Sequence, residues 1–105
     1  MLLVQTTYPL EGYESFIQNI LKTNYVSCVQ SYRVSSIYFW ENKWEEEWEM
    51  LISFKTRKKF FKQIKQEILK NHTYKTPQII ALKVKKVEKG YKKWHNKTLK
   101  ALMKP

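Results

Sequence analysis

Three side chains in this sequence are of the types that bind transition metals most readily, namely Cys28, His72 and His95. Protein sites for copper and zinc are built from imidazole or thiolate groups, commonly about three or four of them. These residues are far apart in the sequence, so only the fold, or symmetric copies of one histidine, could assemble a site. His72 is the candidate metal ligand, with a hydrogen-bonding role in a loop as the alternative.

Cys28 is the only cysteine, which excludes an intrachain disulfide and a multi-cysteine zinc site. It lies in the strand-like stretch 26–29, where a cysteine is typically a buried small apolar residue rather than a reactive thiol. We therefore expect Cys28 to contribute to packing.

Acidic side chains cluster at Glu45, Glu46, Glu47 and Glu49. Such carboxylates could hold divalent cations loosely or act as general acids and bases. The alternation of polar and apolar residues sends most of them to a solvated face of a strand. No nucleophile–base pair and no glycine-rich phosphate loop accompanies them. The sequence therefore predicts a protein that is not an enzyme.

Basic residues are concentrated in the second half of the chain. The net charge is +11, made up of −4 over residues 1–54 and +15 over residues 55–105. This polarity suits nucleic acid, an acidic partner or complementary subunits. There are only two arginines, and the aromatic residues follow core patterns rather than the lysines. Weak nonspecific nucleic-acid binding is thus an alternative function, whereas specific nucleic-acid recognition is not expected.

Length and composition predict one domain spanning residues 1–105, because 105 residues with 43% hydrophobic content can build a single core. No apolar run approaches the roughly 20 residues that a membrane helix needs. Residues 1–7 lack the basic region and cleavage site of a signal peptide. We expect a cytoplasmic protein with no membrane partner.

Hydrophobic periodicity indicates seven elements that must position these side chains. A short buried strand that begins at Leu2 and ends at Gln5–Thr7, closed by Pro9, precedes a helix over 11–23. A second strand begins at Tyr25 and extends to Trp40. A tight turn leads into a strand over 43–55, and Thr56 is predicted to cap a helix to about Lys70. A strand over 77–84 and a final helix over 88–103 follow, with Tyr91, Trp94, Thr98, Leu99, Leu102 and Met103 on one side. This order predicts an α+β, ferredoxin-like βαββαβ sandwich with a C-terminal helix added.

The strand over 43–55 is too long for a domain of this size. Thirteen residues span roughly 43 Å at about 3.3 Å each, whereas a compact domain of about 100 residues is around 34 Å across. The hairpin must bend at a bulge or project beyond its own subunit. A projecting hairpin that carries Tyr38, Trp40, Trp44 and Trp48 would need cover from another chain. We predict these four residues as a subunit interface.

Several segments resemble the CutA (divalent-cation-tolerance) family. Residues 35–43 (SSIYFWENK) resemble its T-S-x-Y-x-W-x-G-K stretch, and residues 71–79 (NHTYKTPQI) resemble its H-P-Y-x-x-P-E-I loop. Residues 27–29 are similar to its A-A-C-V segment, residues 54–56 to its K-T-T junction, and Tyr91 with Trp94 to its closing Y-x-x-W. The similarity covers nearly the whole chain in the right order.

The resemblance implies a homotrimer in which long strands of neighbouring subunits pair around the assembly. It also implies a fold like that of trimeric nitrogen-regulatory signal proteins, a role in tolerance of copper and other divalent metals, and no established enzymatic reaction. Copper is therefore the candidate cofactor. A signalling-type trimer that senses a small molecule or a protein is the alternative function.

A trimer would create three equivalent clefts, and Lys55, His72 and Tyr74 lie at strand and helix ends where such clefts form. Lys55 is expected at the interface, either with a small anionic ligand or in an intersubunit salt bridge to a hairpin glutamate. Family relatives have suggested copper ligands at the positions of Gln5 and Asn71, and these departures leave His72 alone. Three further positions depart from the family motifs. Asn42 stands in place of the motif's glycine, Thr73 in place of its proline and Gln78 in place of its glutamate.

Overall fold

The computed structural model describes residues 1–104. It contains four strands, β1 (Leu2–Pro9), β2 (Cys28–Trp40), β3 (Lys43–Thr56) and β4 (Ile80–Lys83). The helices are α1 (Tyr13–Leu21), α2 (Phe61–Asn71), which follows a 3₁₀ turn η1 (Lys58–Phe60), and α3 (Lys89–Leu102). The strands form one antiparallel sheet in the order β2-β3-β1-β4. The predicted α+β, ferredoxin-like fold with an added C-terminal helix is confirmed.

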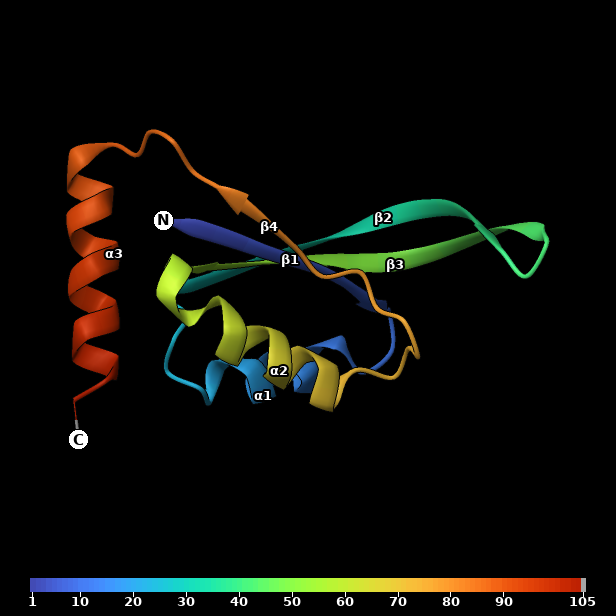
Figure 1. Cartoon of the computed structure of the whole chain (residues 1–105), viewed down its shortest axis with the longest axis horizontal. Helices are drawn as coiled ribbons and strands as arrows, with labels where there is room; N and C mark the ends of the chain where they lie inside the picture. The colour runs from blue at the N-terminus through green and yellow to red at the C-terminus, as the bar shows by residue number, and fades with distance from the viewer. Residues whose placement is uncertain (105) are drawn as a thin grey trace.

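The sheet has one face covered by α1 and α2, while α3 stands across the end where β1 begins (Figure 1). The core lies between the sheet and the two covering helices. Its fully buried members include Val4 and Ile52 of the sheet, with Ile20 of α1 and Ile64 of α2. These residues repeat every two positions in the strands and every three or four in the helices, which is the pattern that predicted the elements.

The hairpin of β2 and β3 runs without a bulge from the pair Cys28–Lys55 to the pair Trp40–Lys43. The two turn residues, Glu41 (φ 50°) and Asn42 (φ 65°), both have left-handed backbones, as a type I′ turn requires. The hairpin therefore projects beyond the helices rather than bending, and the molecule measures 46 × 29 × 21 Å (Figure 1).

Two predicted boundaries were wrong, in the strands that come first and last along the chain. β1 continues to Pro9, because it is a central strand that pairs with β3 along its full length. β4 covers only Ile80–Lys83 rather than 77–84, because its pairing with β1 extends only from Leu2 to Gln5. Both edges of the sheet, β2 and β4, are consequently free of strand partners within the described residues.

Three local predictions were also wrong. β2 begins at Cys28 rather than Tyr25. Thr56 does not cap a helix, because it ends β3 and its hydroxyl donates a 2.6 Å hydrogen bond to the carbonyl of Tyr25. On α3 the buried residues are His95 and Leu99, while Trp94 is 44% exposed. α3 stands across the end of the sheet (Figure 1), so only a narrow stripe of the helix, at His95 and Leu99, is buried.

Candidate functional site

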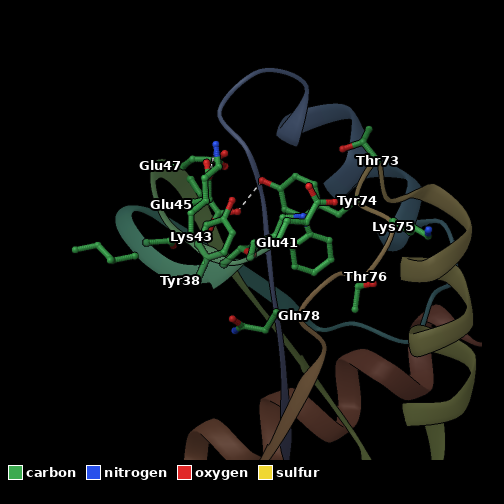
Figure 2. A pocket seen from close by; sticks show the side chains of 15 residues that line it. Tyr38, Glu41, Lys43, Glu45, Glu47, Thr73, Tyr74, Lys75, Thr76 and Gln78 are labelled. Atoms are coloured by element: carbon green, nitrogen blue, oxygen red, sulfur yellow. Dashed lines mark hydrogen bonds and ion pairs between the residues drawn. The ribbon is translucent and has the colours of Figure 1, made fainter.

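A groove of about 840 Å³ lies between the hairpin and the segment that leads into β4. Figure 2 shows Tyr38, Lys43 and Glu45 of the hairpin on one side and Thr73, Tyr74 and Lys75 on the other. The hairpin also contributes Ser36, Ile37, Trp40, Glu41, Glu47 and Glu49, and the remaining lining residues are Thr7, Thr76 and Gln78. The groove exists because the hairpin extends past the covering helices while residues 72–79 return along its base.

Glu49 forms the base of this groove and is only 5% exposed. The phenol of Tyr74 donates a 2.6 Å hydrogen bond to its Oε2 atom. Burial raises the pKa of Tyr74, and the bond to the Glu49 carboxylate raises it further. Tyr74 therefore stays protonated and serves as the donor that a buried carboxylate requires.

His72 has both ring nitrogens engaged. Nε2 lies 2.6 Å from the carbonyl oxygen of Thr7, which can only accept, and Nδ1 lies 3.0 Å from the backbone N–H of Tyr74, which can only donate. These partners fix the tautomer that carries its proton on Nε2. Burial lowers the pKa of His72, which keeps the ring neutral, and the ring also packs against Tyr8 and Phe16.

The alternative predicted for His72, a loop hydrogen-bonder, matches this geometry. Binding of a metal would require the ring to give up its contact with Tyr74 or with Thr7. The positions predicted to have lost metal ligands are also engaged, since Gln5 donates to Ser53 and Asn71 donates to Glu67. In residues 1–104 no three His, Cys, Asp or Glu side chains are placed to hold a metal ion together.

The groove is negatively charged overall. Its lining contains Glu41, Glu45, Glu47 and Glu49 but only two basic residues, Lys43 and Lys75, and Lys43 makes a 3.2 Å ion pair with Glu45. Desolvation raises the pKa of the Tyr38 phenol, and a hydrogen bond with Glu47 raises it further. This environment favours a cationic ligand, whereas the small anionic ligand that the sequence suggested was a partner for Lys55.

Lys55 lies outside this groove, six residues further along β3 than Glu49, which is roughly 20 Å in an extended strand. Its ammonium group donates a 2.9 Å hydrogen bond to the hydroxyl of Tyr91 on α3 and lies 5.0 Å from the centre of that ring. The predicted grouping of Lys55 with His72 and Tyr74 therefore does not occur within one subunit.

Sequence reasoning missed a polar cluster beneath α3. His95 is 1% exposed, its Nδ1 is 2.5 Å from the hydroxyl of Ser27, and its Nε2 is 3.2 Å from the carbonyl oxygen of Thr56. Thr56 O can only accept, so Nε2 carries the proton and Nδ1 accepts from Ser27. The signal was present, because His95 lies four residues before the apolar Leu99 and so shares its helix face.

The four predicted interface residues have different surroundings. Trp40 and Tyr38 line the groove. Trp44 and Trp48 lie on the other face of the hairpin and are 70% and 61% exposed. Trp44 packs edge-to-face against Phe39, and the guanidinium of Arg33 lies near the ring of Trp48, so these neighbours also belong to the hairpin. The first half of β3 thus presents large apolar groups that its own core does not cover.

Residues 2–98 match the CutA1 divalent ion tolerance protein family. This chain belongs to that family. Among its relatives, the divalent-cation tolerance protein CutA of Pyrococcus horikoshii is 34% identical over 95 residues, covering 90% of this chain and 93% of that protein. The CutA of Thermotoga maritima is 32% identical over 95 residues, covering 90% and 94%. The predicted family is confirmed.

Solved CutA structures share the fold of this CutA1-family chain. CutA1 from Pyrococcus horikoshii superimposes with a TM-score of 0.86 at 32% identity, covering 93% of this chain and 97% of that one. The protein described as PII-like CutA from Nostoc sp. PCC 7120 gives 0.86 at 25% identity, covering 94% and 97%. In the described part of this chain, no helix combines the length and apolarity required to cross a membrane.

Proposed function

We propose that this chain works as a non-enzymatic homotrimer in divalent-cation tolerance, with the acidic groove as its cation-responsive site. The observation that carries the proposal is the projecting hairpin, whose long edge strand and aromatic side chains lack cover within one subunit. The role in divalent-cation tolerance is proposed because its relatives are named divalent-cation tolerance proteins.

The exposed apolar surface supports a trimer rather than a lone subunit. Six large side chains of the hairpin are 46% to 70% exposed, namely Tyr32, Ile37, Phe39, Trp40, Trp44 and Trp48. These side chains lie on both faces of the hairpin, and large exposed apolar groups in such number on a soluble protein usually mark interfaces. The outer edge of β2 also offers unpaired backbone groups along 13 residues. Pairing with a neighbouring hairpin would satisfy both the side chains and the backbone.

The chemistry of the groove supports a response to hard, hydrated cations more than to copper. Carboxylate oxygens suit cations such as Mg²⁺, Ca²⁺ and Mn²⁺, whereas copper prefers imidazole and thiolate. Both nitrogens of the His72 imidazole are hydrogen-bonded, to Thr7 and to Tyr74, so the ring is not free to bind copper. Glu49 is linked to His72 through Tyr74. A cation would thus be held loosely, by exposed glutamates that keep part of its hydration shell.

A signalling-type sensor is the second candidate function, and the size of the groove favours it. A volume of about 840 Å³ is within the range of small-molecule sites. With two phenols and a buried carboxylate in its lining, the groove would suit a small organic cation.

A cytoplasmic location is also part of this proposal and stays a prediction. A solved relative from Archaeoglobus fulgidus is described as periplasmic, so family membership alone does not give the location.

Light scattering coupled to size-exclusion chromatography tests the assembly. We expect a mass of three subunits at micromolar concentration, and a mass of one subunit would refute the trimer.

Titration of the trimer with Mn²⁺, Cu²⁺ and a small organic diamine tests the site. Binding that Glu45→Gln and Glu47→Gln weaken, and that the exposed control Glu14→Gln leaves unchanged, supports the acidic groove. Equal effects of all three variants would refute it.

A further inference from the structure

A second cavity, of about 580 Å³, lies at the opposite end of the sheet from the hairpin tip. Its lining consists of Met1, Arg57, Lys58 and Lys59. The three basic residues follow β3 directly and are all exposed. Met1 comes beside them because Leu2 of β1 pairs with Thr56 of β3. The cavity therefore presents three consecutive cationic side chains and no acidic one.

The sheet brings further positive charge to the same end. Leu2 pairs with Lys83 on its other side, and the N–H of Val84 donates a 3.1 Å hydrogen bond to the carbonyl of Met1. The segment that contains Lys85 and Lys86 therefore leaves the sheet next to Met1. Figure 1 shows the N-terminus, the turn after β3 and the end of β4 gathered at this end.

These charges have no carboxylate partner. Over residues 1–104 the single ion pair within 4.0 Å joins Lys43 and Glu45, at the other end of the hairpin. Lys59 instead places its ammonium group 5.1 Å from the centre of the Phe60 ring. Folding thus adds the lysines at the end of β4 to the consecutive charges of residues 57–59 without a carboxylate partner, which costs free energy unless an external anion is bound.

The buried His95 responds to this positive field. Desolvation lowers its pKa, the hydrogen bond to the Thr56 carbonyl opposes this, and the positive charges of the N-terminus, Arg57 and Lys55 lower the pKa further. The positive charge of Arg57, which lines the cavity, therefore also affects a buried side chain under α3.

We propose that the cavity at Arg57, Lys58 and Lys59 binds a compact oligophosphate, either inorganic polyphosphate or the phosphate chain of a nucleotide. Arginine offers a planar fork that binds phosphate through two parallel hydrogen bonds, and the adjacent lysines supply point charges. The volume is in the range of small-ligand sites. None of its lining residues lines the acidic groove, so this site goes beyond the function proposed above.

A nucleic-acid strand is a poorer fit to this cavity. Proteins that bind single strands stack bases on aromatic side chains along an extended groove. The cavity lining contains no aromatic residue, so it offers charge for phosphates and no platform for bases. An anion with several phosphates close together would match three adjacent cations better than a strand with spaced phosphates.

Isothermal titration calorimetry of the intact protein with tripolyphosphate, at low salt, tests the proposal. We expect tripolyphosphate to bind at least about tenfold more tightly than orthophosphate, because several charge-assisted contacts replace one. A second titration with ATP compares a nucleotide with the phosphate chain alone. Affinity equal to that of tripolyphosphate points to the phosphate chain alone, and a gain of more than about tenfold points to a nucleotide as the source.

Two variants with equal loss of charge separate a site from general attraction. The combined changes Arg57→Gln, Lys58→Gln and Lys59→Gln should weaken tripolyphosphate binding by about tenfold or more. The matched control, Lys92→Gln, Lys93→Gln and Lys97→Gln on exposed positions of α3, should change it by less than about twofold. Circular dichroism checks folding, and the single exposed change Lys58→Gln provides a milder second variant.

Three results would overturn the proposal. The first is equal weakening by the two triple variants, because net charge alone would then explain binding. The second is equal affinity for tripolyphosphate and orthophosphate. The third is a single-stranded RNA oligomer that binds to the protein and is not displaced by excess tripolyphosphate, which would assign the basic surface to nucleic acid instead.

Discussion

The phenol of Tyr74 donates a 2.6 Å hydrogen bond to the buried carboxylate of Glu49, and this bond ties the segment before β4 to the base of the hairpin. It joins two elements that are 25 residues apart in the chain. No basic side chain forms an ion pair with Glu49 among the described residues, so Tyr74 is its identified donor. Both the shape of the groove and its stability depend on this pair.

We therefore predict that Tyr74→Phe lowers the free energy of unfolding by about 1–3 kcal/mol, because a buried carboxylate loses its donor. Chemical denaturation of Tyr74→Phe, Glu49→Gln and the double variant measures the coupling. The loss in the double variant should be smaller than the sum of the two single losses. Strict additivity would show that the two side chains do not support each other.

Assembly should depend on the tryptophans of the hairpin and not on exposed tryptophans in general. Trp48→Ala is expected to weaken the trimer by about 3–5 kcal/mol, the usual loss for a tryptophan that is buried in an interface or core. Trp94→Ala on α3 is a matched control, because Trp94 is also partly exposed, at 44%. Dilution series followed by light scattering compare the two, and equal dissociation would rule out a specific hairpin interface.

Acidification should destabilise the fold before the glutamates titrate. Burial lowers the pKa values of both His72 and His95 from the ordinary 6.5. Below pH 6.5 the unfolded chain therefore binds more protons than the folded chain, so stability rises with pH and falls on acidification. Thermal unfolding between pH 7.5 and about pH 5, above the ordinary glutamate pKa of about 4.3, measures this effect.

The variant His95→Gln should flatten this pH dependence, because it removes one of the two histidines. It should also lower stability at neutral pH, since the partners of His95, Ser27 and the carbonyl of Thr56, are then less well satisfied. A wild-type melting temperature that is constant across this pH range would contradict the prediction.

Copper should bind without high affinity. Gln5 and Asn71 occupy two suggested ligand positions, and both nitrogens of His72 have hydrogen-bond partners. Competition of the tag-free trimer against a chelator of known copper affinity measures this. Stoichiometric copper that is retained against a nanomolar chelator and lost in His72→Ala would contradict the prediction, and would indicate that three His72 side chains meet in the assembly.

The alternation of residues in β3 predicted the orientation of its side chains but not their burial. Trp48 and Met50 lie on the same face of the strand, yet Trp48 is 61% exposed and Met50 is 9% exposed. The difference arises because Met50 belongs to the core under the helices, whereas the outer part of the hairpin extends past them (Figure 1). Local sequence records which face is apolar, whereas the extent of cover depends on the tertiary arrangement of other elements.

The polar contacts were less accessible to sequence reasoning than the elements. Tyr74 and His72 were identified as site residues, but their partners Glu49 and Thr7 depend on how the segment after α2 folds back onto the sheet. Glu49 was assigned to a solvated face by alternation, and the returning segment buries it. Within one subunit Lys55 donates to the hydroxyl of Tyr91, and the anionic partner expected at a subunit interface stays a prediction.

The central place of β1 has a consequence for how the chain folds during synthesis. β1 is synthesised before β3 and β4, yet it pairs with β3 on one side and with β4 on the other, and the carbonyl of Met1 accepts a hydrogen bond from the N–H of Val84. The hairpin of β2 and β3 can form from neighbouring residues, whereas the sheet closes only after residues 80–84 have emerged. Until then β1 has an open edge beside an aromatic hairpin, so nascent chains of this protein should be prone to mispairing on crowded polysomes.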